Sequence, residues 1–433
     1  MSEDDKSASP SLALAEITGL HGAFVFSERL LQQIWARGDF YARDLLLRDG
    51  RSLAIVKRGR WNRLPGPDFL DAEIRVGGGA DGEVLRGDIE LHLRASDWGQ
   101  HGHAKDPAYA NVILHVVLFP AVGKDATGAD GRPIPTLELL PLLERDLEAY
   151  AEEAAVEALA GRPFSRLREA LASVPAEELS RLVERHSARR WGLKTALARR
   201  RIEVSGWDAA CHQAALEVLG YRPNRAPMLA VARCMPLEAW REGGDDDIVE
   251  KAWRHSEAEW VRGGVRPANQ PRVRLEQYLR WMRARPDWPA LLAGIGREFA
   301  NETAALSASL MSGGLGQRRR LLRIPRWRSR MAHEVTQDKL GGSRLDTMIC
   351  DAWLPLLAAR LEMQFVGGNC DGWDMARRLW LDWRCGDAPA ELLRLAKEFE
   401  VGGDSAVGGV SQGVLQGLLG WLAALPDEGG RGT

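Results

Sequence analysis

The run from Val112 to Phe119 constrains the fold more than any other stretch, because it is apolar except for one histidine. Such a run is typical of a β-strand buried on both faces. Strand-like alternation precedes it at Ser52–Val56, Leu70–Val76 and Val84–Leu93. A helix is expected before these strands, since Leu30, Leu31, Ile34 and Trp35 recur at helical spacing. The sequence therefore predicts a sheet-centred domain in its first third.

The remaining elements complete an α/β arrangement. The polar stretch Trp98–Tyr109 suits a short helix or loop, and Pro135–Leu139 suits a further strand at the edge. From about Leu142 the chain becomes rich in Ala, Leu, Glu and Arg, which favours helices. The predicted organisation is a disordered tail at residues 1–11, an α/β domain at 12–145, a mainly α-helical region at 146–425 and a flexible tail at 426–433.

Bulk composition excludes some classes of protein. A chain of 433 residues is long enough for two or three domains. Its net charge of −2 gives no general attraction to polyanions. The acidic first residues do not resemble a secretory signal, and no apolar run is long enough to span a bilayer. We predict a cytoplasmic protein without a membrane partner, and the sequence does not indicate its oligomeric state.

Histidines and carboxylates crowd into one part of the predicted α/β domain. Four of the nine histidines lie between positions 92 and 115, namely His92, His101, His103 and His115. Imidazole nitrogens and carboxylate oxygens are the ligands of divalent metals. Little comparable chemistry occurs elsewhere in the chain, so we place the functional site here.

Two carboxylates in this region are expected to meet. Glu90 and His92 are two apart in a predicted strand and share a face with Asp88. If the strands starting near Asp68 and Val84 pair, Asp68 approaches Glu90. Two carboxylates and a backbone carbonyl suit Mg²⁺ or Mn²⁺, and His92 can orient or deprotonate a water at neutral pH.

These residues resemble the motif of the PD-(D/E)XK nuclease superfamily. Pro67-Asp68 matches its first half, and Glu90-Leu91-His92 stands where its E-x-K is expected. The order helix, three strands, helix, strand also resembles the superfamily's core. The resemblance implies a restriction-endonuclease-like fold and a metal-dependent phosphodiesterase that acts on DNA or RNA. Asp68 and Glu90 would hold the metal, Leu91 would lend a carbonyl, and Glu28 would be an accessory acid.

The chain departs from that motif at His92, where the superfamily has lysine. A neutral histidine stabilises phosphate charge less well than a fixed cation. An alternative is therefore a catalytically inactive, nuclease-like scaffold that binds nucleic acid or protein. A purely structural role for Asp68 and Glu90, as partners of buried arginines such as Arg75, Arg86 or Arg94, also stays open.

A wider set of motifs resembles a bacterial family known only as a domain of unknown function. Its landmarks here are Gly66-Pro67-Asp68-Phe69, Asp88-Ile89-Glu90-Leu91-His92, Ser96-Asp97-Trp98, His101-x-His103, Asp106-x-x-Tyr109, Val112-Ile113-Leu114-His115-Val116-Val117, Arg266-Pro267-Ala268-Asn269-x-Pro271 and Ser411-Gln412-Gly413. The resemblance covers most of the chain and implies no reaction.

The remaining histidines allow two interpretations. In a helix, His101 and His103 would diverge, whereas in an extended loop they could share a face. Together with Asp106 they either cap helix ends or orient His92 and its metal. If His92, His101 and His103 instead bind the metal themselves, the protein is a zinc hydrolase. His115, flanked by apolar residues, is expected to be a buried core residue.

An arginine-rich stretch in the helical region is the predicted nucleic-acid contact. It has no acidic residue within it and one interleaved aromatic, a composition that suits phosphate contacts and base stacking. Solvated helix faces have the same composition, so that interpretation stays open as well. Its members are Arg318, Arg319, Arg320, Arg323, Arg326, Trp327, Arg328 and Arg330.

Overall fold

A computed structural model describes two compact units, residues 1–154 and 155–433, each with its own hydrophobic core. The described residues are 28–42, 44–62, 64–78, 82–119, 125–143, 150, 163–242, 245–257, 259–303, 314–364, 371–401 and 409–425. The predicted tails at 1–11 and 426–433 lie outside them. Among the described helices, none is both long and apolar enough to cross a bilayer.

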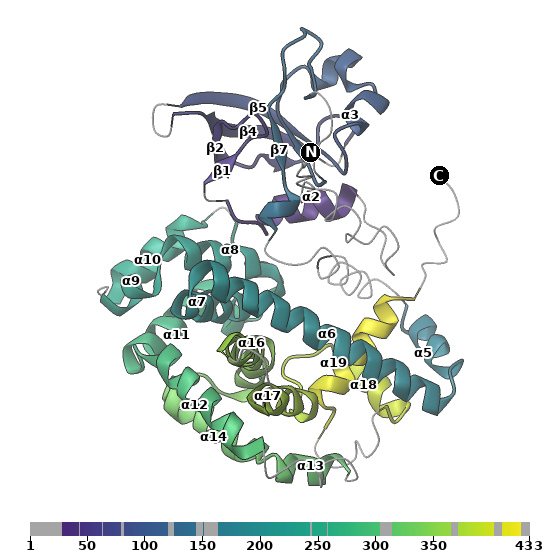
Figure 1. Cartoon of the computed structure of the whole chain (residues 1–433), viewed down its shortest axis with the longest axis vertical. Helices are drawn as coiled ribbons and strands as arrows, with labels where there is room; N and C mark the ends of the chain where they lie inside the picture. The colour runs from purple at the N-terminus through teal and green to yellow at the C-terminus, as the bar shows by residue number, and fades with distance from the viewer. Residues whose placement is uncertain are drawn as a thin grey trace, which may run out of the picture. The chain divides into compact units, whose positions relative to one another are not determined.

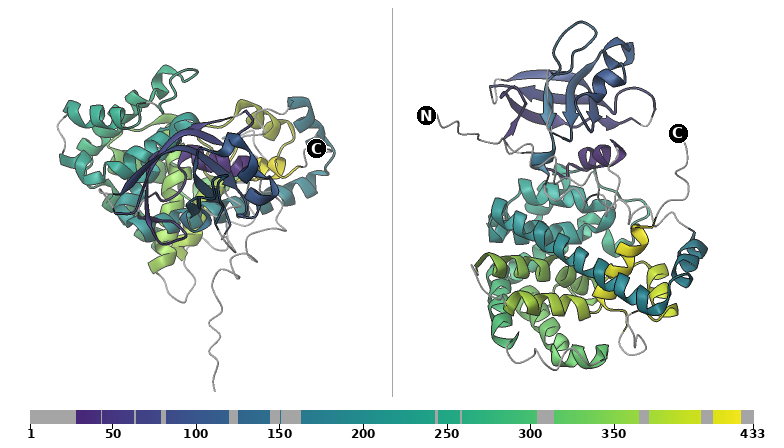
Figure 2. Two further views of the ribbon diagram at one scale, coloured as in Figure 1. Left: turned by 90° about the horizontal axis from the view of Figure 1, so that it is seen from above. Right: turned by 45° about the vertical axis from the view of Figure 1, so that its right-hand side comes forward.

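The first unit is built on a mixed sheet of seven strands (Figure 1). Its main path runs β1-β2-β4-β5-β6-β7, with β3 paired to β4. The strands are β1 (Leu45–Leu46), β2 (Ser52–Lys57), β3 (Arg60–Trp61), β4 (Phe69–Val76), β5 (Glu83–His92), β6 (Val112–Val117) and β7 (Thr136–Glu138). Pairing is antiparallel from β1 to β5 and parallel from β5 to β7. The sheet is twisted, as the further views in Figure 2 show.

Strand β6 confirms the expectation from its apolar run. All six of its residues are buried, and it pairs in parallel with β5 on one side and β7 on the other. Helix α2 (Glu28–Arg37) covers the same core with Leu30, Leu31, Ile34 and Trp35, the residues that recur at helical spacing. Their burial anchors α2 beside β5, and the polar face of α2 is left free for other contacts.

The segment between β5 and β6 forms the short helical turns expected of Trp98–Tyr109. They are α3 (Asp97–Gln100), followed by the 3₁₀ turns η2 (His103–Lys105) and η3 (Pro107–Tyr109). Strands β1 and β3 were not predicted, because two-residue strands are too short to show alternation. A bulge between Phe69 and Ala72 interrupts β4, where Asp71 adopts a φ of 60°.

The second unit is largely helical, as its composition indicates. Its α-helices are α5 (Phe164–Ala172), α6 (Ala176–Ser205), α7 (Trp207–Leu219), α8 (Tyr221–Cys234), α9 (Leu237–Glu242), α10 (Asp245–His255), α11 (Pro271–Ala284), α12 (Trp288–Thr303), α13 (Leu315–Leu321), α14 (Ile324–Arg330), α15 (Gly342–Met348), α16 (Leu354–Gln364), α17 (Asp371–Asp382), α18 (Ala390–Glu398) and α19 (Gln412–Ala423). The long helix α6 packs against α16 and α19 (Figure 1). Tryptophans such as Trp281, Trp353 and Trp380 are fully buried in this unit's core.

Gly87 is required where β5 begins to pair with β6. A Cβ at this position would lie 2.3 Å from the Asn111 carbonyl oxygen and 2.6 Å from Ile113 Cγ2. We expect Gly87→Ala to lower the free energy of unfolding by about 1–3 kcal/mol, because the two strands must separate. Urea unfolding would measure it, with Gly99→Ala as the control, since a Cβ there meets no atom within 4 Å. Equal stability of the two variants would contradict this account of the pairing.

Candidate metal centre

The end of β5 brings the two predicted carboxylates together. The Asp68 backbone N–H donates to Glu90 Oε2 at 3.0 Å, and the Leu91 N–H donates to Asp68 Oδ2 at 3.0 Å. The two residues meet because β4 and β5 pair with Phe69 opposite Ile89. The expected approach of Asp68 to Glu90 is therefore present. The Leu91 N–H is thus used to hold Asp68, and a role of the Leu91 carbonyl oxygen toward a metal stays a prediction.

Helix α2 completes the setting of Asp68. Gln32, on the polar side of α2, donates from Nε2 to Asp68 Oδ1 at 2.6 Å. Burial raises the pKa of Asp68 to about 6, although the hydrogen bonds from Leu91 and Gln32 oppose the rise. Gln32 was not predicted as a site residue, and its only signal in the sequence is its position one helical turn after Glu28.

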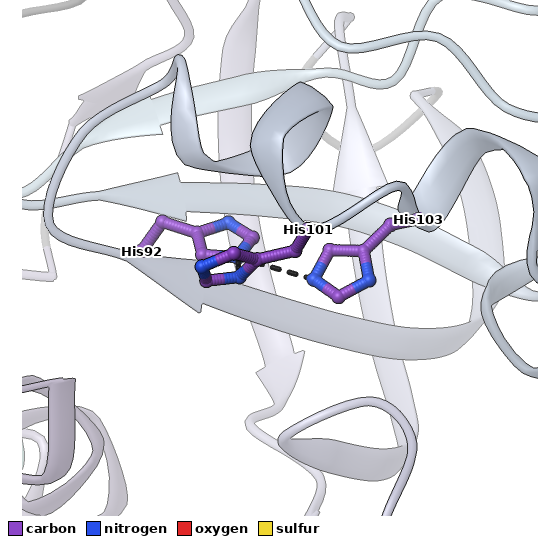
Figure 3. Close-up of side chains that lie close together, drawn as sticks. All are labelled: His92, His101 and His103. Carbon is purple, nitrogen blue, oxygen red and sulfur yellow. Dashed lines mark hydrogen bonds between the residues drawn. The ribbon is translucent and has the colours of Figure 1, made fainter. Parts of the chain in front are cut away.

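The imidazole rings of His92, His101 and His103 lie close together (Figure 3). His92 Nε2 lies 3.2 Å from His101 Nδ1 and 3.3 Å from His103 Nε2. One ring nitrogen from each of the three histidines lies within 4.8 Å of the other two. His92 and His103 are buried, whereas His101 is exposed. The cluster therefore reaches solvent through His101.

A left-handed glycine explains how two histidines in one segment face the same point. His101 ends α3, Gly102 has a φ of 73°, and His103 begins the next turn. The reversal at Gly102 points both rings toward His92, an arrangement that neither a regular helix nor an extended loop would give. The segment is thus neither the single helix nor the extended loop that were considered for His101 and His103.

Glu90 is the carboxylate that borders the imidazoles. Its Oε1 lies 3.4 Å from His103 Nε2 and 3.6 Å from His92 Nε2, and the residue is only 6% exposed. Burial, followed by the nearby charge of Asp68, raises the pKa of Glu90 to about 9. No lysine or arginine within the described part of the chain forms a salt bridge with Asp68 or Glu90, so partnership with buried arginines does not explain this pair.

Three further rings, those of His115, Tyr109 and Trp98, pack against the imidazoles of His92 and His103. His92 Nδ1 lies 2.9 Å from His115 Nε2, and His115 is fully buried in β6. Tyr109 stacks on His103 with ring centroids 3.8 Å apart. Trp98 packs edge-on against His92 and His103. His115 is thus a core residue as expected, but its ring also fixes the orientation of His92.

Their surroundings keep the rings of His92 and His115 neutral. Burial lowers the pKa of His92 to about 2 and that of His115 to about 4, and the neighbouring imidazoles lower the pKa of His92 further. Neutral His92 has one ring proton. If Nδ1 carries it and donates to His115, the lone pair of His92 Nε2 points at His101 and His103, the tautomer that a metal ligand requires.

The donor set fits a tetrahedral cation. Zinc–nitrogen bonds of about 2.0–2.1 Å place tetrahedral ligands about 3.3–3.4 Å apart. His92 Nε2 lies at such a separation from His101 Nδ1, at 3.2 Å, and from His103 Nε2, at 3.3 Å, and a cation held by the three rings would keep its fourth position open. Each of these two contacts is also within hydrogen-bonding distance, with the donor set by the tautomers, and a bound cation would take the place of the shared proton. The chemistry of the donors favours zinc over magnesium.

The other predicted residues differ in their distance from this centre. Glu28 borders it, since its charge affects His101, Asp68 and Glu90, and burial raises its own pKa. Asp88 instead accepts from the Asp71 N–H at 3.2 Å, at the bulge in β4. Asp106 caps η3 by accepting from the Ala108 N–H at 2.9 Å, so the capping interpretation applies to it.

The predicted nucleic-acid contact lies in the second unit, in α13 and α14. Three of its arginines have acidic partners outside the stretch. Arg318 pairs with Asp382, Arg328 with Asp346, and Arg330 with Glu298 and with Glu334, which lies one helical turn further along the chain. Trp327 is fully buried and packs against Phe299, so its face is not available to a base. Much of the positive charge expected to meet phosphates is thus neutralised within the unit.

Comparison with known proteins gives one match. A family model described as a protein of unknown function (DUF2851) matches residues 28–253, which is more than half of the chain and includes every residue of the metal centre. The predicted resemblance to an uncharacterised family is thereby confirmed. No curated protein and no solved structure matches the chain. The resemblance to the PD-(D/E)XK superfamily stays a prediction.

Proposed function

The chain belongs to the DUF2851 family of proteins of unknown function, and from that premise we propose that its first unit is a metal-dependent hydrolase. His92, His101 and His103 hold the metal, and Glu90 is the general base. The observation that carries the proposal is the convergence of three imidazole nitrogens within 4.8 Å of one another, with Glu90 Oε1 3.4 Å from one of them.

Zinc is the ion that best suits this set of ligands. Catalytic zinc sites have three protein ligands and one open position, and histidine is a common ligand in them. A bound zinc ion supplies a Lewis acid that makes water a nucleophile at neutral pH. Mg²⁺ or Mn²⁺ held by Asp68 and Glu90 is the second candidate, supported by the hydrogen bond that joins those residues.

Glu90, Asp68 and His101 have different roles in the proposed reaction. A cation held by the imidazoles would favour the carboxylate form of Glu90 and so lower its raised pKa. Glu90 Oε2 is fixed by the Asp68 N–H, which leaves the ionised Oε1 on the imidazole side to take a proton from the attacking water. Asp68 is itself fixed by Leu91 and Gln32, so it positions Glu90 rather than acting on substrate. His101 is the exposed ligand, and substrate approaches from its side.

Phosphodiesters of nucleic acid are the proposed substrates. Support comes from Asp68 and Glu90 on neighbouring strands, and from the order of α2, three antiparallel strands, a helical segment and parallel β6. Both features are those that the superfamily resemblance implies. His92 participates as a metal ligand in this proposal, so the absence of lysine does not by itself prevent turnover.

A cleavage assay on the full chain tests the function. Protein stripped by a chelator would be reloaded with Zn²⁺, Mn²⁺ or Mg²⁺ and given single- and double-stranded DNA and RNA, with p-nitrophenyl acetate as a carboxylic ester. We expect cleavage of nucleic acid only after reloading, and strongest with Zn²⁺. Asp68→Ala should be slower, because the backbone at position 68 loses the side-chain hydrogen bonds to Leu91 and Gln32 that hold its N–H against Glu90.

Three results would argue against parts of this proposal. Unchanged cleavage by Asp68→Ala would contradict the positioning role. Hydrolysis of the carboxylic ester alone would replace the substrate class. Stoichiometric zinc with no hydrolysis of any substrate would favour the inactive scaffold that binds nucleic acid or protein.

A further inference from the structure

A recess in the helical unit has an excess of positive charge that its own carboxylates do not balance. Its volume is about 320 Å³, and its wall includes Arg328, Arg384, Lys397, Leu393 and Val410. Asp346 is the one acidic residue in that wall. All of these residues belong to the second unit, so the recess is separate from the metal centre.

Each carboxylate around the recess has an arginine of its own. Asp346 receives two hydrogen bonds from Arg328, at 2.7 and 3.2 Å, and a third from Trp383 Nε1. Asp382 receives two from Arg318, at 2.9 and 3.0 Å. Such bidentate pairs leave little charge on a carboxylate for another cation.

A third carboxylate near the recess, that of Asp387, also has an arginine partner. Asp387 lies 2.8 Å from Arg344 Nη2 and accepts from the hydroxyl of Ser343, a residue of the recess wall. Arg344 is buried, with its guanidinium over the ring of Tyr221. Asp387 is therefore held by its own partners.

Two positively charged side chains of the recess wall have no acidic partner among the described residues. Arg384 and Lys397 form no ion pair with an acidic residue in the part of the chain that the structure describes, and both are exposed. Arg319 adds to the local charge, since it bonds the backbone carbonyls of Asp382 and Gly409 at the rim. Burial lowers the pKa of Arg319, and the positive charge of Arg384 lowers it further.

We propose that this recess binds a small molecule through a phosphate group, with Arg384 and Lys397 as its ligands. Two separate cations suit the several terminal oxygens of a phosphate, which can accept hydrogen bonds from both. The recess is larger than a phosphate ion needs and is of the size of small-molecule sites. Leu393 and Val410 give the organic part of the ligand an apolar surface.

Isothermal titration of the full chain tests the proposal, with inorganic phosphate and phenyl phosphate as probes. We expect both to bind, and phenyl phosphate to bind more tightly. Arg384→Gln and Lys397→Gln should each weaken binding about tenfold, since each removes a charged hydrogen bond. Arg394→Gln is the matched control, because Arg394 lies on α18 with Lys397 but stacks on Phe164 outside the recess.

Three outcomes would overturn the site. They are the absence of binding by wild type, equal affinity of the Arg384 and Lys397 variants with wild type, and an equal loss in Arg394→Gln. Weaker binding of phenyl phosphate than of inorganic phosphate would overturn the organic part of the ligand. Thermal unfolding of each variant confirms that the fold persists, as expected for exposed side chains.

Discussion

Replacing His101 with alanine is expected to weaken zinc binding by at least about a hundredfold. Loss of a group that only orients a ligand costs 10- to 100-fold in metal affinity, and loss of a ligand costs more. His101 is exposed and its ring contacts are with other histidines, so its removal leaves the core intact. Competition with a fluorescent zinc chelator measures the affinity.

The control for His101 is another exposed histidine on a helix. His255 is the last residue of α10, in the second unit, and it belongs to no group of possible metal ligands found among the described residues. We expect His255→Ala to keep the affinity of wild type. Unchanged affinity in His101→Ala would exclude His101 as a ligand, and an equal loss in both variants would show that zinc binds at the surface.

Replacing Glu90 with glutamine is expected to slow hydrolysis by about 10²- to 10⁴-fold, the usual contribution of a general base. Glutamine keeps the size of the side chain and still accepts from the Asp68 N–H, but it cannot take a proton from water. Bound zinc should stay near one per chain, because the three imidazoles are unchanged. Single-turnover kinetics with matched metal content measure the effect.

Glu83→Gln is the matched control on the same strand. Glu83 is the exposed first residue of β5, at the end of the strand opposite to the metal centre. Its variant should hydrolyse substrate at the rate of wild type. A Glu90→Gln variant with full activity would remove Glu90 from the mechanism, whereas loss of both zinc and activity would make Glu90 a ligand instead.

The main features of the α/β unit were predictable because its apolar patterns are strong. Val112–Val117 could be recognised as a buried strand, and α2 by the spacing of its apolar residues. Asp68 and Glu90 could be brought together because neighbouring antiparallel strands fix which residues meet. Edge strands of two residues, such as β1 and β3, leave no comparable pattern.

The geometry of the histidines was not predictable in the same way. It depends on one backbone angle at Gly102, which turns His103 back toward His92. It depends also on a parallel pairing that sets Glu90 beside His115 in β6. The sequence suggested a metal held by Asp68 and Glu90, with zinc held by His92, His101 and His103 as an alternative. It could not choose between them, because apolar patterns do not reveal the angle at Gly102 or the register of the parallel pair.

The acidic partners of the arginine-rich stretch were not predictable from the sequence for a similar reason. No acidic residue lies between Arg318 and Arg330. Their partners Asp382, Asp346 and Glu298 come from other helices, which only the packing of the unit brings near. A count of local charges therefore misses the ion pairs of Arg318, Arg328 and Arg330, and nucleic-acid contact by this stretch stays a prediction.

The most direct test of the metal centre is the metal content of the purified full chain after zinc loading and exhaustive dialysis. We predict one zinc ion per wild-type chain, and less than a tenth of that in a variant with alanine at positions 92, 101 and 103. Circular dichroism would show whether that variant keeps its fold. Wild-type protein that retains no zinc, or a triple variant that retains as much as wild type, would contradict a metal held by these imidazoles.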